Sequence, residues 1–327
     1  QWGTMATIYD VAALAGVSPA TVSRVFNGTK VSDDKVAAVR DAAERLSFTP
    51  NRAARTLRRQ SSEVIALVIP DIENPYFTEM ARGVEDAASE SGYSVVLCNS
   101  DAQPEKESTY LRIAMAERMS GVILAAASAQ TDLAEVLTAG RPVVAVDRSA
   151  GHDIDEVVMA NREAGRQAAA HLLRTHSRVA YIGGPADIET SAERAEGWRL
   201  AHRDAGVAVP EHLLRFASFR VDGGRRAMEE LLALPEPPDA IVAGNNLIGV
   251  GAIQVLSEHG VAPPRIGVAV VGSLPYTTLR PSAVTVVRLP ARQMGVTAAR
   301  MLLDRIHGDD QPPRTVVLRG DLQPAAD

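Results

Sequence analysis

The sequence has 327 residues, of which 46% are hydrophobic and 23% are charged. This length predicts two or three domains at roughly 100 to 200 residues each, and this composition excludes disorder over the whole chain. No apolar run reaches the ~18 residues of a membrane span, and no secretion signal is evident at the start, so neither a membrane protein nor a secreted one is expected. The single cysteine, Cys98, excludes an intramolecular disulfide framework and a multi-cysteine zinc site. The residues before Met5 are expected to be a remnant of expression.

The charge is distributed unevenly along the chain. Residues 1–60 contain nine Lys or Arg and five Asp or Glu, a net charge of +4, whereas the whole chain carries −6 and the remainder therefore −10. A basic amino-terminal part on an acidic body favours a polyanionic partner, such as nucleic acid, for the first part. Chance clustering of charges on a solvated surface is the alternative that charge alone leaves open.

Three short helices are predicted in the first 50 residues. Thr7 and Asp10 have the spacing of a capping box, and Gly16 allows a tight turn after the first helix. Ser18 is predicted to cap a second helix with Pro19 in its first turn. A third helix is predicted from its cap and its apolar seam at Ser32, Val36, Val39, Ala43 and Leu46. Two short helices joined by a turn with glycine and followed by a third are typical of a helix-turn-helix domain.

The second helix presents small and polar side chains away from its apolar stripe of Val22 and Val25. Small groups let the backbone approach the major groove of DNA, and hydroxyls can bind phosphates. Arg24 can bind a guanine edge with two hydrogen bonds. The outward set consists of Pro19, Ala20, Thr21, Ser23 and Arg24. Three-helix units also occur outside DNA-binding proteins, so the geometry alone leaves a purely structural role open.

Three motifs with fixed spacing occupy this region, TIYDVA at 7–12, AGVS at 15–18 and TVSRVFN at 21–27. They strongly resemble the LacI/GalR family of bacterial transcription regulators, and the similarity continues through the body to about residue 320. The resemblance implies a homodimer that binds a pseudo-palindromic DNA operator as a repressor, with the second helix in the major groove.

Residues 50–57, PNRAARTL, resemble the hinge helix of that family. By that resemblance two such helices pair in the minor groove, and Leu57 is the apolar wedge in the central base step. A segment of about eight residues is too short to hold a helix alone, so it is expected to order only against its twin and DNA. A charged interdomain linker without a DNA role is the alternative. The candidate DNA contacts are then Thr7, Tyr9, Ser18, Pro19, Ala20, Thr21, Ser23, Arg24, Asn27, Asn51, Arg52, Ala54, Arg55 and Leu57.

From residue 64 onward, short apolar strands alternate with amphipathic helices in two series. This alternation predicts parallel sheets with right-handed crossovers, and two series over ~260 residues predict two doubly wound α/β lobes. The first series has predicted strands at 64–69, 94–97, 122–126 and 143–146, and predicted helices at 75–91, 104–118 and 132–139. The second has predicted strands at 157–159, 179–182, 213–216, 241–242 and 268–271, and predicted helices at 162–174, 192–205, 223–234 and 248–258.

The two-lobed body resembles the periplasmic-binding-protein type 1 fold of the same family. The resemblance implies a helix-turn-helix domain over 5–50, a hinge helix and linker over 51–61, and an effector-binding and dimerisation domain over 62–327. Its N-lobe is expected at about 62–160 and 291–319 and its C-lobe at about 161–289. The chain is expected to cross between lobes near Ala160-Asn161, Leu289-Pro290 and residue 320. A small-molecule effector is expected in the cleft between the lobes.

Two pairs of residues in the first series are candidate effector contacts. Tyr76 and Phe77 follow the first strand at a helix start, where they either stack on a ligand ring or pack beneath their helix. Asp147 and Arg148 end the fourth strand, at the edge where open α/β sheets bind ligands. An interlobe salt bridge is the alternative role for that second pair.

Further candidates lie in the second series. Arg194 falls in residues 191–198, which have the family pattern S-x-x-R-x-x-G-aromatic, and the resemblance makes this arginine the main effector contact. Phe219, Asn245 and Leu274 also fall at family ligand positions, although Asn245 can instead be only a helix cap. The chain departs from the family at Asn246, Leu274 and Leu289, where the family often has Asp, a carboxylate and Gln. Fewer acids beside Arg148 and Arg194 predict an anionic sugar derivative, such as a sugar acid or phosphate ester, alongside a sugar-like effector.

No catalytic motif of a hydrolase, nucleotide-binding enzyme or zinc protease occurs, so neither an enzyme nor a cofactor or metal site is expected. The sequence therefore predicts a cytoplasmic, nucleoid-associated homodimer that binds operator DNA and a small-molecule effector and has no membrane partner. A solute-binding protein of a transporter and a sugar-modifying enzyme are the alternative functions.

Overall fold

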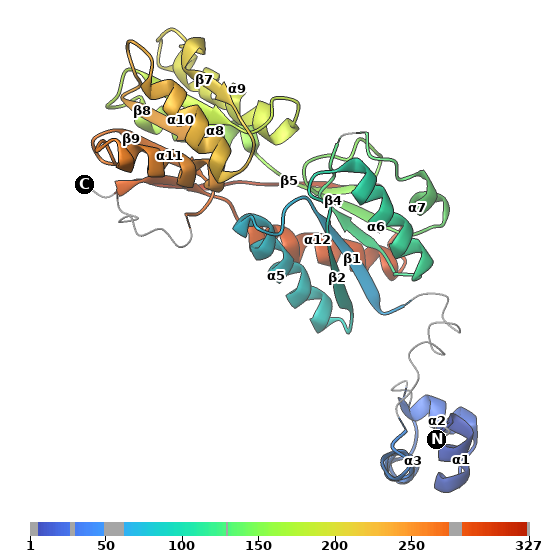
Figure 1. Ribbon diagram of the computed structural model, residues 1–327. Helices are drawn as coiled ribbons and strands as arrows, with labels where there is room; N and C mark the ends of the chain where they lie inside the picture. The colour runs from blue at the N-terminus through green and yellow to red at the C-terminus, as the bar shows by residue number, and fades with distance from the viewer. Residues whose placement is uncertain (1–5, 27–29, 49–61, 129, 275–282, 326–327) are drawn as a thin grey trace. The chain divides into compact units, whose positions relative to one another are not determined.

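The computed structural model describes residues 6–26, 30–48, 62–128, 130–274 and 283–325 (Figure 1). The chain divides into two compact units, residues 1–62 and residues 63–327. Each unit has buried apolar side chains of its own. Among the described residues, no helix combines the length and the hydropathy that a bilayer crossing requires.

The first unit consists of α1 (Ile8–Ala15), α2 (Pro19–Phe26) and α3 (Asp33–Arg45). α1 begins with the predicted capping box, in which the Asp10 carboxylate accepts from Thr7 N at 2.7 Å and Asp10 N donates to the Thr7 hydroxyl. Gly16 ends α1 with a φ of 65°, the left-handed region that favours glycine, and so permits the turn into α2. Ser32 occupies the N-cap position of α3, but its side chain makes no capping hydrogen bond, so that part of the prediction is wrong.

One small core holds these three helices together. Val11 of α1, Val22 of α2 and Val39 of α3 are fully buried in it. The rings of Phe26 and Phe48 pack at its edge with their centroids 5.9 Å apart. Val22 is the buried residue of α2, Val25 and Phe26 pack partly against the core, and Ala20 and Arg24 are exposed.

The second unit contains two six-stranded sheets (Figure 1). The first has the order β11-β5-β4-β3-β1-β2 and is parallel throughout. Its strands are β1 (Val64–Ile69), β2 (Ser94–Asn99), β3 (Val122–Leu124), β4 (Val143–Asp147), β5 (Asp155–Met159) and β11 (Thr315–Leu318). The lobe around this sheet is the N-lobe.

The second sheet has the order β12-β10-β9-β8-β6-β7 and forms the C-lobe. It is parallel except for β12, which pairs antiparallel with β10. Its strands are β6 (Val179–Gly183), β7 (Leu214–Phe216), β8 (Ala240–Ala243), β9 (Gly267–Val271), β10 (Thr285–Arg288) and β12 (Asp321–Gln323). Two doubly wound α/β lobes are therefore confirmed.

Some strand predictions need correction. The strand at 157–159 was assigned to the second series, but β5 pairs with β4 and β11 in the first sheet. β10, β11 and β12 were not predicted from the sequence. These strands have only three or four residues each, and β11 and β12 follow one another without a helix, so no α/β alternation marks them.

Helices cover both faces of each sheet. Along β1, Ile65, Leu67 and Ile69 belong to the core beneath α5 and α12, whereas Ala66 and Val68 belong to the core beneath α6 and α7. In the C-lobe, α8 and α9 share one core and α10 and α11 share the other. The helices of the body are α5 (Pro75–Glu90), α6 (Pro104–Ala116), α7 (Ala134–Thr138), α8 (Asn161–Leu172), α9 (Glu189–Asp204), α10 (Val221–Leu232), α11 (Asn246–Glu258) and α12 (Ala291–Ile306), with a short 3-10 helix at Glu211–Leu213.

Reciprocal glycines bring three helix pairs into backbone contact. A Cβ on Gly165 of α8 would lie 2.1 Å from the Arg194 carbonyl oxygen, and one on Gly197 of α9 would lie 2.0 Å from the Arg162 carbonyl oxygen. Gly83 and Gly295 serve α5 and α12 in the same way, and so do Gly224 and Gly251 for α10 and α11. Any larger residue would force each pair apart.

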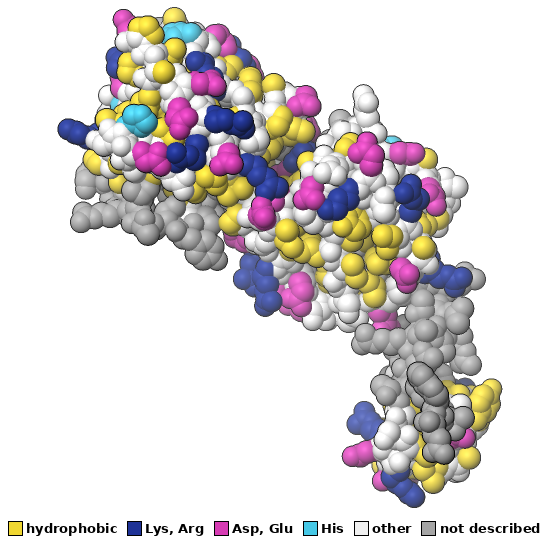
Figure 2. Space-filling view, viewed as in Figure 1, with side chains coloured by type: hydrophobic (Ala, Val, Ile, Leu, Met, Phe, Trp, Pro, Cys, Tyr) yellow, Lys and Arg dark blue, Asp and Glu magenta, His cyan; other side chains and the backbone are white. Residues whose placement is uncertain are grey.

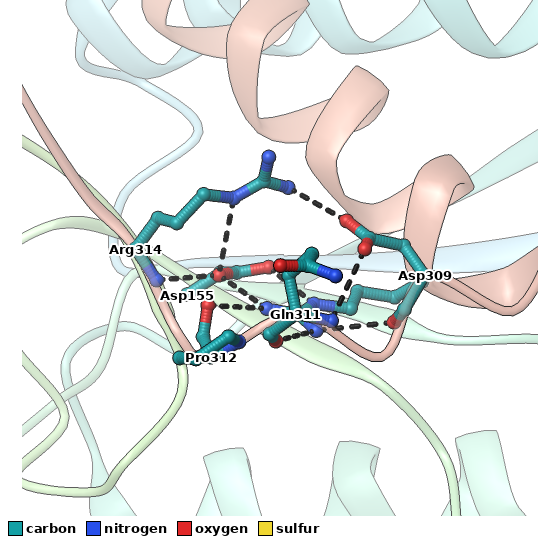
Figure 3. Close-up of polar contacts among 6 residues, drawn as sticks. Asp155, Asp309, Gln311, Pro312 and Arg314 are labelled. Carbon is teal, nitrogen blue, oxygen red and sulfur yellow. Dashed lines mark hydrogen bonds and ion pairs between the residues drawn. The ribbon is translucent and has the colours of Figure 1, made fainter.

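The chain passes between the two sheets three times, after β5, after β10 and after β11. A buried ion-pair cluster ties the start of β5 to the end of α12 and to the segment that leads into β11 (Figure 3). Asp155 begins β5 with a fully buried carboxylate, which accepts from Arg305 Nε at 2.7 Å, Arg305 Nη2 at 2.9 Å and Arg314 N at 2.8 Å. Burial raises the pKa of Asp155, but these hydrogen bonds and cations outweigh it and lower the pKa overall.

Candidate functional site

α2 presents small and polar side chains to solvent. Because Val22 is buried, helical periodicity turns Ala20 and Arg24 outward, and both are exposed. Three predicted DNA contacts on the same helix are half-buried, namely Pro19, Thr21 and Ser23. On α1, Tyr9 is 68% exposed although it is aromatic. The surface of α2 thus carries small and polar side chains and one guanidinium.

Two hydroxyls of this region already make intramolecular bonds. Ser18 Oγ lies 2.9 Å from Thr21 Oγ1 and accepts from Thr21 N at 3.2 Å, which caps α2. Thr7 Oγ1 donates to the Asp10 carboxylate at 2.7 Å, and hydrogen bonds from Thr7 lower the pKa of Asp10. These hydroxyls thus fix the starts of α1 and α2. Six predicted DNA contacts lie outside the described residues: Asn27, Asn51, Arg52, Ala54, Arg55 and Leu57.

A cavity of about 480 Å³ lies between the N-lobe and the C-lobe. Seven of the eight predicted effector contacts line it, namely Tyr76, Phe77, Asp147, Arg148, Arg194, Phe219 and Asn245. Leu274 does not line the cavity: it packs against the apolar core of the C-lobe, near Gly249. That apolar environment suits a leucine and would disfavour a carboxylate.

Arg194 is the most deeply set cation of the cavity. It lies on α9, is 5% exposed, and donates from Nε to Asn161 Oδ1 and from Nη1 to the Gly244 carbonyl, each at 2.8 Å. Both partners are neutral, so no carboxylate pairs with this guanidinium among the described residues. Gly165 lets α8 approach the backbone of Arg194, which brings Asn161, one turn earlier on α8, within reach of Nε.

Asp147 and Arg148 form a pair within the N-lobe rather than the interlobe bridge considered as an alternative. Arg148 Nη2 lies 3.3 Å from Asp147 Oδ2, and the two side chains are 8% and 5% exposed. Asp147 has a φ of 69°, a left-handed conformation that costs about 1–3 kcal/mol for a residue with a side chain. Such strain at a strand end that faces a cavity is typical of a functional site.

Charged side chains of both lobes act on Tyr76, namely Asp147 and Arg148 of the N-lobe and Arg194 of the C-lobe. Burial raises the pKa of its hydroxyl well above the ordinary value, and the Asp147 carboxylate raises that pKa further, whereas Arg194 and Arg148 act in the opposite direction. The Tyr76 hydroxyl also lies 3.4 Å from Met294 Sδ on α12. Its ring meets Phe77 edge to face at 5.1 Å, and Phe77 is 5% exposed and belongs to the N-lobe core. Phe77 therefore packs beneath α5 as well as lining the cavity.

Phe219 and Asn245 form part of the C-lobe wall. The Phe219 ring lies against Gly184, where a Cβ would come within 2.2 Å of a ring carbon. Asn245 caps α11 by accepting from Ile248 N at 2.8 Å, and its Nδ2 donates to the Phe219 carbonyl at 3.2 Å. Asn245 thus serves as the helix cap and lines the cavity at once.

Several lining residues were missed by sequence reasoning. Asp71, Asn74 and Arg220 line the cavity, and so does Asn246, which was noted only as a departure from the family. Asn74 precedes Pro75 at a helix start after β1, a position that could have identified it. Nothing in the sequence places Arg220 opposite Asp71, because that proximity arises from the packing of two lobes.

A helix-turn-helix unit joined to a two-lobed body with an interlobe cavity defines a class of ligand-responsive DNA-binding regulators, and comparisons with known proteins agree. Residues 7–51 match the family described as bacterial regulatory proteins, lacI family, and residues 62–321 match the periplasmic binding proteins and sugar binding domain of the LacI family. The chain is 36% identical to the transcriptional regulator CelR of Thermobifida fusca over 97% of this chain and 96% of that one.

Two further comparisons cover nearly the whole chain. The transcriptional repressor PurR of Actinobacillus pleuropneumoniae is 32% identical, with 97% of both chains covered. A CelR–cellobiose complex is similar in structure with a TM-score of 0.72 and 33% identity, over 97% of this chain and 98% of that one. The chain therefore belongs to the LacI family of bacterial regulatory proteins. These relatives are transcriptional regulators rather than enzymes.

Proposed function

We propose that this protein is a dimeric DNA-binding repressor whose affinity for an operator is set by a small-molecule effector in the interlobe cavity. The observation that carries the proposal is the combination, in one chain, of an exposed arginine-bearing α2 and a buried arginine-bearing cavity. The relatives named as a repressor and a regulator support the first half, and the cellobiose complex of CelR supports the second. Because its partner is DNA, the protein acts in the cytoplasm at the nucleoid.

DNA is read by α2 in this proposal. Arg24 is the exposed guanidinium of that helix and binds a base edge, while Ala20 permits close approach. Tyr9 and the hydroxyl pair of Ser18 and Thr21 contact the phosphate backbone, with their remaining hydrogen-bonding capacity. The family resemblance adds the residues of 51–57, with Leu57 as the minor-groove wedge.

The effector is an anionic sugar derivative in this proposal. Burying an unpaired guanidinium costs several kcal/mol, and Arg194 has only neutral partners. The carboxylate of Asp147, also deep in the cavity, is already paired with Arg148. At one C-lobe position of the cavity where the family often has an aspartate, this chain has Asn246, so a carboxylate or phosphate on the ligand would supply the anionic partner that Arg194 lacks.

Dimerisation is proposed through the N-lobe, at the edge formed by β2. Val96 and Leu97 are 40% and 39% exposed on this edge strand, and Ile113 of α6 is 43% exposed. Figure 2 shows hydrophobic side chains gathered on the visible face of the lobe that carries β1 and β2. An apolar edge strand is an aggregation hazard unless it is covered, which a second copy would do.

Effector and DNA are coupled through lobe closure. A ligand that changes the angle between lobes changes how the N-lobes of a dimer hold the two DNA-reading units. The coupling is reciprocal, so an effector that weakens operator binding must bind less tightly to the operator-bound protein. The DNA affinity measured with and without effector, and the effector affinity measured with and without DNA, should therefore give the same coupling free energy.

The test is selection of bound duplexes from a random DNA pool, followed by fluorescence anisotropy on the selected sequence. Recovery of an inverted repeat, bound at least about 1,000-fold more tightly than random duplex at moderate salt, is expected. Titration calorimetry against neutral sugars, sugar acids and sugar phosphates then tests the effector class. Equal affinity for all duplexes would refute operator recognition, and tight binding of only a neutral sugar would refute the anionic effector.

A further inference from the structure

Three contacts join the N-lobe and the C-lobe directly at the rim of the cavity. Arg220, at the N-cap position of α10, places Nη2 3.5 Å from Asp71 Oδ1, and its Nη1 donates to the Glu73 carboxylate. Asn246, at the start of α11, donates from Nδ2 to Asn74 Oδ1 at 3.1 Å. These five side chains, three from the N-lobe and two from the C-lobe, are called the rim latch.

The rim latch is connected to the ligand-facing start of α5. Asn74 Oδ1 accepts from Asn246 and also from Tyr76 N at 3.0 Å, so one oxygen caps α5 and binds the opposite lobe. Both amides are buried, with exposures of 6% for Asn74 and 3% for Asn246. An aspartate at position 246, as the family often has, would place a carboxylate against this oxygen and break the contact. The amide at 246 is thus what makes the bond between lobes possible.

The strength of each ion pair in the rim latch depends on how far solvent reaches its acidic side chain. The Glu73 side chain is 74% exposed, so solvent screens its pairing with Arg220. Asp71 is only 14% exposed, and its carboxylate also accepts from Glu73 N at 3.0 Å, so it is held in place. Asp71 is therefore the stronger partner of Arg220, although its distance is longer.

Among the described residues, a further hydrogen bond between the lobes lies nearer the hinge. Ser149 N donates to Glu189 Oε2 at 3.2 Å. Glu189 lines a second cavity together with Ala160, which lies in the first segment that crosses between the lobes. A contact near a hinge changes little when the lobes rotate, whereas a contact at the rim is broken. Closure therefore depends mainly on the rim.

We propose that the rim latch holds the cleft closed in the ligand-free protein, with Arg220 and Asn246 as the residues that set the closed fraction. All its contacts are between protein groups, so closure needs no ligand. The functional role of the latch rests on the regulator proposed above. In that regulator, an effector can enter the cavity only after the latch opens. The apparent affinity is then reduced by the scarcity of the open form.

Protection of a buried thiol measures this closed fraction without any ligand or DNA. Thr190 lines the cavity and is 2% exposed, so Thr190→Cys in a Cys98→Ala background places the sole thiol inside the closed cleft. Its reaction rate with an uncharged thiol reagent is proportional to the open fraction when opening is fast. Arg220→Gln is expected to raise the rate about threefold to fivefold, and Asn246→Ala about fivefold.

A matched control and a double-mutant cycle separate the latch from general effects of charge. Arg215→Gln removes a C-lobe arginine paired with Glu230 in the same lobe, and it is expected to leave the rate unchanged. Asp71→Asn is expected to raise the rate, and its combination with Arg220→Gln to raise it no further than the larger single change.

The proposal is overturned if Arg220→Gln reacts at the rate of the Arg215→Gln control, or if the Arg220 and Asp71 effects multiply as independent factors. An unchanged rate for Asn246→Ala overturns the amide part. Because the assay contains neither DNA nor effector, failure of the latch leaves the proposed regulator intact, and failure to find an operator leaves the latch result standing.

Discussion

Arg194 offers a test that separates a ligand-binding arginine from a structural one. Arg194→Met removes two charge-assisted hydrogen bonds, to Asn161 Oδ1 and to the Gly244 carbonyl. Each such bond contributes about 1.5–3 kcal/mol, but burying the guanidinium without a counterion costs several kcal/mol. The two effects oppose each other, so the free energy of unfolding of the ligand-free protein is expected to change by less than about 1 kcal/mol.

The ligand affinity is expected to respond quite differently. A ligand anion bound by Arg194 loses at least one charge-assisted bond of about 1.5–3 kcal/mol, which is about 10- to 150-fold in Kd. The assay is thermal unfolding monitored by fluorescence, without ligand and with a panel of sugar acids and sugar phosphates, followed by calorimetry on those that raise the Tm of the native protein. The expected result is a native Tm without ligand and the loss of the ligand-induced rise.

Arg199→Met is the matched control on the same helix. Arg199 pairs with Glu211 at 2.6 Å on the surface and does not line the cavity. It is expected to retain the ligand-induced rise in Tm. A large fall in the Tm of the Arg194→Met protein together with unchanged ligand affinity would show that Arg194 is structural, and the reasoning from its uncompensated charge would be refuted.

Three further predictions concern the other parts of the molecule. Arg24→Ala should cost ~1–3 kcal/mol at one base position of the operator in anisotropy measurements, and an equal loss on every duplex would show a phosphate contact instead. Val96→Asp should shift the protein toward monomer in sedimentation. The control Val207→Asp, at a residue of the C-lobe that is 45% exposed, should leave the protein dimeric. If both variants stay dimeric, the β2 edge is not the dimer interface. Asp155→Asn should destabilise the body by about 3–5 kcal/mol at pH 7, because Arg305 loses its buried partner. Since the pKa of Asp155 is lowered from 3.8, its contribution is present above that pH and is lost as the pH falls below it, so the difference between variant and native protein in urea unfolding should shrink there.

The architecture couples these sites through small residues and short segments. Reciprocal glycines fix α8 against α9 and thus the position of Arg194, while the cluster around Asp155 fixes β11 beside β5. These contacts lie within a lobe or beside the hinge, whereas the described polar contacts that must break when the lobes separate are those of the rim latch and of Ser149 with Glu189. Such a division of rigid lobes and a breakable rim is what a hinge motion requires.

The sequence by itself determined the class of this protein through its family motifs, and it determined most of the local structure through local chemistry. The capping box of Thr7 and Asp10, the turn at Gly16 and the alternation of strands with helices all act over a few residues, so they can be read in chain order. The same holds for the pattern around Arg194, which the family resemblance marked and which the structure places in the cavity. Helix ends that depend on such local bonds were predicted well, although Ser32 shows that a capping residue can stand at the right position without making its bond.

Tertiary structure alone decided which side chains meet across the lobes. Arg220 and Asp71 are far apart in the sequence, and so are Asn246 and Asn74. No periodicity in the sequence encodes such pairs. It also decided that β5 joins the first sheet, that Leu274 turns into a core, and that Asp147 pairs with its neighbour instead of the opposite lobe. The physical reason is that sequence patterns report on local backbone preference and burial, whereas these contacts depend on how helices, sheets and lobes pack against one another.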